Sequence, residues 1–412
     1  MTNDAINRQQ FLARFHEVDS RDSAIAVKSV LATCDAQAVE DGPLNNVAVL
    51  IKDNIEAVGL PGSAGSLALA DSPARRDAQL VQRLRAAGAD IVGATNLSEW
   101  ANIRSTRSAS GWSGMGGLTG NPWQLDRSAG GSSSGSGAAV AAGLVSLAIG
   151  SETDGSIVCP ASLNGVVGLK PTVGSISTHG IVPISASQDT PGPLTTDVRL
   201  AALAFEVMSG SSGSVAAVDN SAEIARGLSV GVVKSWLTGH AETDALFAST
   251  VQLLQKLVQR VGDSAAPAAG GQEHEDEFLV LQCELKDDLA AYFADRLGAS
   301  HHLKTLRDVV EFNREHASQE LQHFGQEIFE LAIETEGRSG EPYKQARQRN
   351  LSWALETCLL PAFEEFDLLV APGYGPAWKS DLVIGEHGAV AGGSTTPAAI
   401  AGDRKSTRLN SS

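Results

Sequence analysis

The chain has 412 residues, of which 42% are hydrophobic and 19% are charged, a composition typical of globular proteins. Its formal net charge of −17 argues against nucleic acids and anionic membrane surfaces as partners. The four cysteines are scattered without metal-ligand spacing, and the N-terminus has no apolar signal sequence, so we expect a cytoplasmic protein with reduced thiols; a periplasmic or secreted homologue is the alternative.

The first third of the chain alternates predicted strands and helices. Residues 47–51 form an apolar run that predicts a buried strand, and residues 78–87 carry apolar side chains on one helical face before Gly88. Residues 91–94 predict a second short strand, and residues 97–100 predict the start of another helix. This alternation predicts an α/β layered core.

A long segment rich in Gly, Ser, Asn and Pro follows at residues 104–137. Loops of this length in compact domains are usually functional or disordered. The segment leads into a predicted helix of small residues at 137–143 and then into an apolar strand at 144–150. Residues 166–169 predict a further strand.

The second half of the chain is more acidic, and its sequence predicts mostly helices. Its predicted elements are a helix at 197–209, a strand at 228–233, a helix from 241 to a C-cap at Gly262, an acidic linker at 263–275, a mostly helical region at 276–360 and a returning strand at 366–372. Residues 395–402 begin like a helix. We interpret residues 403–412, which are basic and poor in apolar residues, as a non-native tail.

Three polar residues carry the candidate chemistry. Lys52 ends an apolar run, where burial would lower its pKa and leave a neutral amine that can act as a base; an edge-strand lysine that reaches solvent is the alternative. Ser156 follows a predicted strand and a Gly-containing turn, and a helix start there would supply free backbone N–H groups for an oxyanion; a plain N-cap serine is the alternative.

Ser132 is the candidate link between these two residues. It lies in the loop Gly-Gly-Ser-Ser-Ser-Gly, and its hydroxyl could relay a proton from Ser156 to Lys52; a flexible linker is the alternative. The same loop fits the G-x-S-x-G nucleophile elbow, but that motif requires a preceding strand and the sequence here predicts a loop. The Lys-Ser/Thr of a phosphate-binding loop and the zinc motif HExxH are absent, and of nine histidines only His179 lies near the serine clusters.

Taken together, the Gly/Ser-rich loop, the small-residue helix and the strand leading to Asp154-Gly155-Ser156 resemble the amidase signature family of serine hydrolases. The stretch GVVGLKPT at residues 165–172 is equally typical of that family. Residues 96–101, 110–113 and 187–193 resemble its bacterial peptide amidase branch. The resemblance is strong over residues 45–210 and weak over residues 275–400.

The resemblance implies an α/β fold with a large mixed central β-sheet covered by helices on both faces, built as one domain over residues 1–402. Within it, residues 45–210 would form the catalytic core, residues 241–365 a helical substrate-side region and residues 366–372 the returning strand. Family members continue beyond the equivalent of Gly402 with further strands of the sheet. The resemblance therefore implies a C-terminally truncated chain that is less stable and poorly active.

For the site, the resemblance implies a nucleophile at Ser156, a bridging serine at Ser132 that follows a cis peptide bond from Gly131, and a base at Lys52. It places the oxyanion hole on the backbone N–H groups of Thr153, Asp154, Gly155 and Ser156. The implied reaction hydrolyses a carboxamide to a carboxylate and ammonia through an acyl-enzyme, with no metal or organic cofactor.

The substrate implied is a small-molecule or peptide amide, with peptide-like amides favoured. One alternative is the glutaminase subunit of a tRNA-dependent amidotransferase, which shares the three site residues but works in a complex. The other is a truncated, inactive amidase-like protein. The sequence leaves the oligomeric state open.

Overall fold

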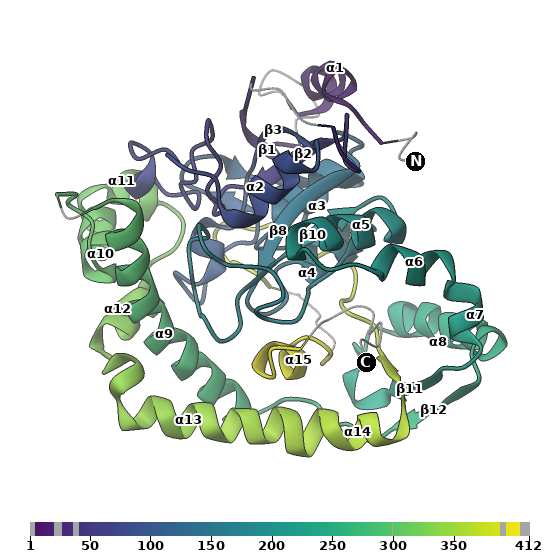
Figure 1. The fold of residues 1–412 in the computed structure, drawn as a ribbon. Coiled ribbons are helices and arrows are strands. Elements are labelled where there is room, and N and C mark those ends of the chain that lie inside the picture. Colours follow the sequence, from purple (N-terminus) through teal and green to yellow (C-terminus); the bar gives the residue numbers. More distant parts are fainter. Residues whose placement is uncertain (1–4, 20–26, 36–40, 299, 388–392, 404–412) are drawn as a thin grey trace.

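The computed structural model describes residues 5–19, 27–35, 41–298, 300–387 and 393–403. A six-stranded sheet forms its centre (Figure 1), in the order β1 (Val30–Thr33), β3 (Asp90–Thr95), β2 (Ala48–Lys52), β8 (Leu147–Glu152), β10 (Thr190–Thr195) and β9 (Val167–Gly168). Strands β3, β2 and β8 are parallel, whereas β1, β10 and β9 each run antiparallel to a neighbour. The sheet is therefore mixed.

Helices cover both faces of this sheet because its central strands are buried on both sides. In β2, Val49 and Ile51 pack into a cluster with α2 (Gln79–Ala86) and α5 (Val198–Ser209). The alternating residues Ala48 and Leu50 pack into a second cluster with α1 (Arg8–Val18) and α3 (Ser134–Ala141). Successive strand side chains point to opposite faces, which explains the apolar run at residues 47–51. The predicted α/β fold with helices on both faces is confirmed.

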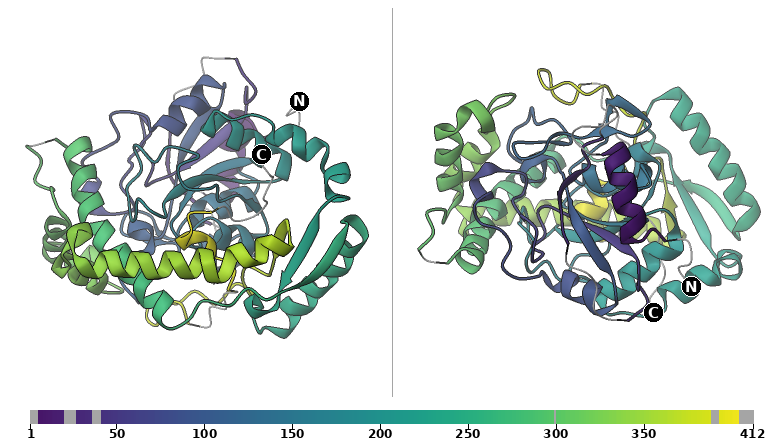
Figure 2. Two further views of the ribbon diagram at one scale, coloured as in Figure 1. Left: turned by 60° about the horizontal axis from the view of Figure 1, so that its bottom comes forward. Right: turned by 90° about the horizontal axis from the view of Figure 1, so that it is seen from above.

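A second sheet and a helical region form the rest of the molecule. The second sheet has three parallel strands in the order β12 (Arg260–Ser264), β11 (Ser229–Val233) and β13 (Leu368–Val370). The helical region packs around its own apolar cluster, which includes Leu285, Phe293, Val309 and Phe329. Figure 2 shows that α13 (Glu341–Ser352), a π-helical stretch (Trp353–Leu359) and α14 (Leu360–Glu365) form one long rod between the helical region and the second sheet.

The described chain contains further helices. They are α4 (Val158–Asn164), α6 (Ser214–Asp219), α7 (Ser221–Ala225), α8 (Ala241–Leu257), α9 (Gln272–Arg296), α10 (Leu306–Glu315), α11 (Ala317–Glu320), α12 (Glu327–Glu334) and α15 (Thr396–Ile400), with single 3₁₀ turns at Leu67–Leu69, Glu99–Asn102, Lys234–Trp236 and Gly337–Ser339. Within the residues placed, no helix has the length and apolar character that a bilayer crossing needs. Of the tail predicted to be non-native, residues 404–412 lie outside the described residues.

Three local predictions are wrong. Residues 97–100 do not start an α-helix: Trp100 and Ala101 have positive φ angles of 48° and 54°. The backbone N–H of Trp100 donates to Ala64 O, so a contact between distant segments replaces helical bonding. Helix α8 ends at Leu257, well before the predicted C-cap at Gly262. Gly262 instead lies in β12, because valines spaced for a helix also suit a strand and pairing with β11 decides between them.

The third correction lies in residues 104–137, where helix α3 has already begun; of the two alternatives for this segment, functional or disordered, the structure excludes disorder. These residues contain two short antiparallel pairs, β4 (Trp112–Ser113) with β5 (Gly117–Leu118) and β6 (Gly120–Asn121) with β7 (Gln124–Ser128). Helix α3 begins at Ser134, earlier than predicted.

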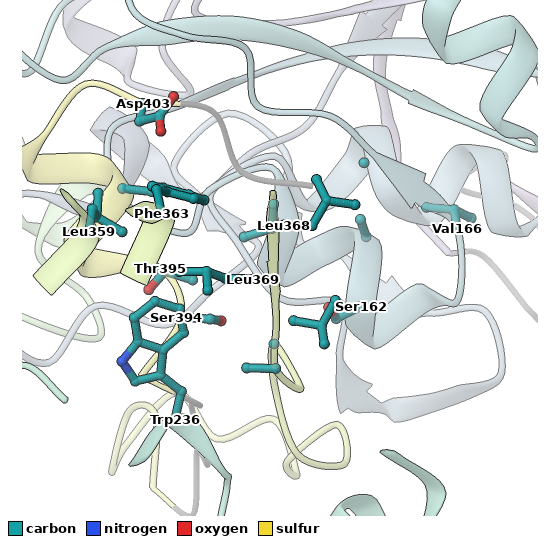
Figure 3. A pocket seen from close by; sticks show the side chains of 17 residues that line it. Ser162, Val166, Trp236, Leu359, Phe363, Leu368, Leu369, Ser394, Thr395 and Asp403 are labelled. Carbon is teal, nitrogen blue, oxygen red and sulfur yellow. The ribbon is translucent and has the colours of Figure 1, made fainter. Parts of the chain in front are cut away.

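A cavity of about 400 Å³ separates the central sheet from the second sheet (Figure 3). Its walls include Gly168 in β9, an edge of the central sheet, and Leu368 to Val370 in β13, an edge of the second sheet. Trp236, Phe363 and Thr395 also line the cavity. The edges of the two sheets therefore face one another across a gap, and no hydrogen-bonded strand joins them within the described chain.

Candidate active site

The site lies where parallel strands of the central sheet end side by side. Lys52 is the last residue of β2, and β2 pairs in parallel with β8, which ends at Glu152. Helices α3 and α4 follow the Gly/Ser loop and β8, respectively. In open α/β sheets, ligands bind in the crevice beyond the carboxyl ends of the strands.

Lys52 is fully buried, and its Nζ atom contacts three oxygen atoms. Nζ lies 2.8 Å from Ser132 Oγ, 2.9 Å from Ser151 Oγ and 3.1 Å from the Ser151 carbonyl oxygen. The alternative of an edge-strand lysine that reaches solvent is therefore wrong. The structure brings Lys52 and Ser132 into direct contact.

The surroundings of Lys52 suit a neutral amine. Burial lowers the pKa of Lys52 to about 7, although the charges of Asp189 and Glu152 oppose this shift. The three contacting oxygens belong to neutral groups. An ammonium can donate to all three, whereas a neutral amine can donate to the two Ser151 oxygens and accept the Ser132 hydroxyl proton. The same geometry therefore accommodates both protonation states, as a base requires.

The Gly/Ser loop is fixed in place. The Gly131–Ser132 peptide bond is cis, as the family resemblance implies. Ser132 is fully buried, and its carbonyl oxygen accepts a hydrogen bond of 3.0 Å from the Ser98 N–H. The Ser133 N–H donates to the Ser156 carbonyl oxygen at 3.0 Å. The flexible-linker alternative is therefore wrong, and the loop adjoins the segment that carries Ser156.

Glu152, rather than Ser156, caps the start of α4. Its carboxylate accepts hydrogen bonds from the N–H groups of Gly155 at 2.9 Å, Ile157 at 2.7 Å and Val158 at 3.0 Å. Ser156 is buried and its side chain does not cap the helix, so the N-cap alternative is wrong. Among the described residues, the Ser156 hydroxyl makes no hydrogen bond, including none with Ser132.

The turn at residues 153–156 departs in one respect from the expected oxyanion hole. The N–H of Gly155 is used by Glu152, as described above. No hydrogen bond of the described residues uses the N–H of Thr153 or of Ser156. The Asp154 carboxylate accepts a hydrogen bond of 2.7 Å from the Thr396 hydroxyl, which ties the turn to α15.

Sequence reasoning missed three residues of this site. Ser151 contacts Lys52 through two oxygens, and its Oγ also accepts a 2.9 Å hydrogen bond from Asn54 Nδ2. Asp189 accepts a 2.5 Å hydrogen bond from the Thr153 hydroxyl, and burial raises the pKa of Asp189 to about 6. The available signals were the position of Asn54 two residues after Lys52 and the inclusion of Asp189 in the motif at 187–193.

The histidine nearest in sequence to the serine clusters does not join the site. The side chain of His179 is exposed, and its Nε2 lies 3.5 Å from Asp295. Asp295 belongs to α9, in the helical region. The absence of a histidine beside Lys52 within the described chain leaves the lysine as the candidate base.

Comparison with known proteins assigns the family. The sequence pattern of the Amidase family matches residues 8–384. A probable amidase of Arabidopsis thaliana is 37% identical over 327 residues, which cover 74% of this chain and 62% of that protein. A glutamyl-tRNA(Gln) amidotransferase subunit of Salinispora tropica is 33% identical over 396 residues, which cover 88% of this chain and 78% of that protein.

The fold gives the same result. The crystal structure of native peptide amidase from Stenotrophomonas maltophilia superposes with a TM-score of 0.86 at 37% identity, covering 96% of this chain and 84% of that one. The chain spans 62% of the length of the Arabidopsis relative and 62% of a putative amidase of Schizosaccharomyces pombe. On its sequence and its fold, the chain belongs to the amidase signature family.

Proposed function

We propose that this chain is an amidase that hydrolyses a carboxamide to a carboxylate and ammonia through an acyl-enzyme on Ser156. The observation that carries this proposal is the buried amine of Lys52, 2.8 Å from Ser132 Oγ, with a pKa of about 7. A nucleophilic serine needs an adjacent group that takes its proton, and Lys52 is the candidate base at this site.

The first half of the reaction forms the acyl-enzyme. Ser156 Oγ attacks the amide carbonyl carbon, its proton passes to Ser132, and the Ser132 proton passes to neutral Lys52. The N–H groups of Thr153 and Ser156 stabilise the negative oxygen of the tetrahedral intermediate. When the C–N bond breaks, the proton returns along the same path to the leaving nitrogen, which departs as ammonia.

The second half hydrolyses the ester. A water molecule attacks the acyl carbon and gives its proton through Ser132 to Lys52. The bond between the acyl carbon and Ser156 Oγ then breaks, and the proton returns to Ser156. The products are a carboxylic acid, which ionises, and the original enzyme, so protons and electrons balance without a co-reactant.

The favoured substrate is the terminal carboxamide of a peptide or a peptide-like molecule. The support is the similarity to peptide amidase, which has also been crystallised with the competitive inhibitor chymostatin; that complex superposes on this chain with a TM-score of 0.86.

A role as the glutaminase component of a larger enzyme is the second candidate, supported by the similarity to the glutamyl-tRNA(Gln) amidotransferase protein of Salinispora tropica. Ammonia release from the isolated chain separates the two. A free-standing amidase releases ammonia from a peptide amide without a partner, whereas a component of a complex prefers glutamine and depends on its partner.

The decisive experiment combines labelling and turnover. A serine-reactive fluorophosphonate should label Ser156, and the chain should release ammonia from N-acylated amino-acid amides. Lys52→Ala, Ser132→Ala and Ser156→Ala should each lower kcat at least about a hundredfold, the lower end of general acid–base effects. Ser249→Ala, on the exposed face of α8, is the matched control. Losses below tenfold for the three site variants would refute the proposed relay.

A further inference from the structure

Tyr374 packs against the segment that carries Ser156, although it lies in the last part of the chain. It follows β13, and its ring packs with Cys159, Leu163 and Trp378. Cys159 and Leu163 belong to α4, the helix that begins just after Ser156. This packing holds the ring of Tyr374 over the start of α4.

The hydroxyl group of Tyr374 lies directly on the turn at residues 153–156. A methyl group placed on Gly155 would come 2.5 Å from the hydroxyl oxygen. Gly155 also has a φ angle of 85°, a conformation that favours glycine. Both constraints keep position 155 free of a side chain and leave the Tyr374 oxygen in contact with the turn.

Within the described residues, the hydrogen-bond partner of this hydroxyl is a thiol. Among the described residues, no nitrogen or oxygen atom forms a hydrogen bond with it, and its nearby polar group is the thiol of Cys159, a weak acceptor. Burial, reinforced by the acidic groups of Cys159 and Asp154, raises the pKa of Tyr374 well above its ordinary range. The phenol therefore keeps its proton under the conditions in which neutral Lys52 acts as a base.

The turn itself lacks one donor that such a site would use. The N–H of Gly155 donates to Glu152 at 2.9 Å and is not available to a substrate. The Tyr374 hydroxyl lies against Gly155 and can donate a hydrogen bond in place of this N–H. Preorganised donors at the position where negative charge develops stabilise a transition state more than the ground state.

We propose that Tyr374 is a further catalytic residue, whose hydroxyl donates a hydrogen bond to the substrate carbonyl oxygen as Ser156 attacks. This inference rests on the proposed amidase function and adds a side-chain donor to the N–H groups of Thr153 and Ser156. It predicts an effect on kcat for any primary amide, whatever its acyl part, because the hydrogen bond is made to the reacting carbonyl.

Tyr374→Phe tests the proposal because it removes the hydroxyl and keeps the ring packing. We expect kcat to fall at least about tenfold, since loss of one oxyanion donor typically costs about 10²–10³. KM should change less than twofold, and the fluorophosphonate should label Ser156 more slowly by a similar factor. Tyr343→Phe is the matched control: it removes a 2.6 Å hydrogen bond to Glu284 in the helical region and should leave kcat unchanged.

Thermal unfolding of both variants separates catalysis from folding. A Tyr374→Phe chain that melts like the wild type and keeps its kcat within twofold would overturn the proposal, and so would a change in KM alone. In either case the amidase function stands if the wild type releases ammonia from amides and Ser156→Ala does not. A wild-type chain that neither hydrolyses amides nor reacts with the fluorophosphonate would refute the proposed function and this inference together.

Discussion

At the scale of single residues, burial changes the protonation of Lys52. A lysine with its ordinary pKa of 10.5 is charged at neutral pH, and here loss of solvent lowers the pKa to about 7. The atoms that touch its amine are oxygens of Ser132 and Ser151, and none of them is a carboxylate. The neutral amine of this candidate base therefore results from the removal of water around it, and the two serines supply its hydrogen bonds.

The pH dependence of activity follows from this pKa. Only neutral Lys52 can accept a proton, so kcat/KM should rise about tenfold per pH unit below pH 7 and level off above it. Steady-state rates from pH 5 to pH 9 test the prediction. A midpoint near the ordinary lysine pKa, or a flat profile, would contradict it.

Stability should depend on the same group. The folded pKa is lowered, so between pH 7 and pH 10 the unfolded chain binds the extra proton and the folded chain does not. The contribution of Lys52 to the free energy of unfolding therefore increases as the pH rises through this window, by on the order of 4 kcal/mol. Urea unfolding of the wild type and Lys52→Met at both pH values measures it. Relative to Lys52→Met, the wild type should have a higher free energy of unfolding at pH 10 than at pH 7. An equal difference between the two chains at both pH values would contradict the prediction.

Ser151 should raise the pKa of Lys52 without taking part in the proton relay. Ser151→Ala removes one oxygen that accepts from the amine, and hydrogen bonds from a charged donor are stronger than those from a neutral one. The ammonium form loses more, so the pKa of Lys52 should fall further and the acid limb of the pH profile should move to lower pH. The pH profile of the variant is the measurement, and a shift towards higher pH would exclude this role.

At the scale of elements, the turn between β8 and α4 is organised by one carboxylate. The first N–H groups of a helix have no partner within the helix, and Glu152 accepts from three N–H groups in this segment. The negative charge also lies near the positive end of the helix dipole. Because Glu152 is the last residue of β8, the strand and the helix are tied together on either side of Ser156.

Glu152→Gln should therefore destabilise the turn and lower kcat. The amide offers one acceptor oxygen instead of two, so at least one buried N–H group loses its partner, at a cost of about 1–3 kcal/mol. We expect a lower melting temperature and a lower kcat. Glu223→Gln, on the exposed surface of α7, is the control. An equal melting temperature for Glu152→Gln and the wild type would show that the N–H groups find other partners.

At the scale of the whole molecule, residues after β13 contact the turn that carries Ser156. The Thr396 hydroxyl in α15 donates to the Asp154 carboxylate, the Tyr374 hydroxyl lies against Gly155, and a cavity of about 400 Å³ lies between α4 and the second sheet. Contacts of segments far apart in sequence thus hold the turn, while the space between the two sheets remains a weak point of the packing.

Filling this cavity should stabilise the protein. Ala398 lines the cavity from the C-terminal helix, and Ala398→Leu adds apolar surface that the walls can bury. We expect a gain of about 0.5–2 kcal/mol in the free energy of unfolding, the usual range for cavity-filling changes. Urea unfolding measures it, with Ala245→Leu on exposed α8 as the control. A loss of stability for Ala398→Leu alone would indicate that the cavity cannot take a larger side chain.

The sequence by itself determined the layers of the fold and the types of residue at the site. Apolar runs and helical spacing identify the central strands and α2, because a buried strand and an amphipathic helix each leave a local pattern. The family resemblance singled out Lys52, Ser132 and Ser156 as site residues, and it also implied the cis bond that the structure contains. Their catalytic roles stay predictions for the experiments above.

Only the tertiary structure decided which groups meet. Trp100 leaves the helical conformation and Gly262 joins a strand because distant segments supply their backbone partners. Local sequence does not predict that Ser151 contacts Lys52, because the register between strands decides it. Nor does it predict that Tyr374 contacts Gly155, because the path of the chain after β13 decides it. A sequence pattern records the burial of each segment against a core. The pairing of particular atoms depends on how segments far apart in the chain share one space.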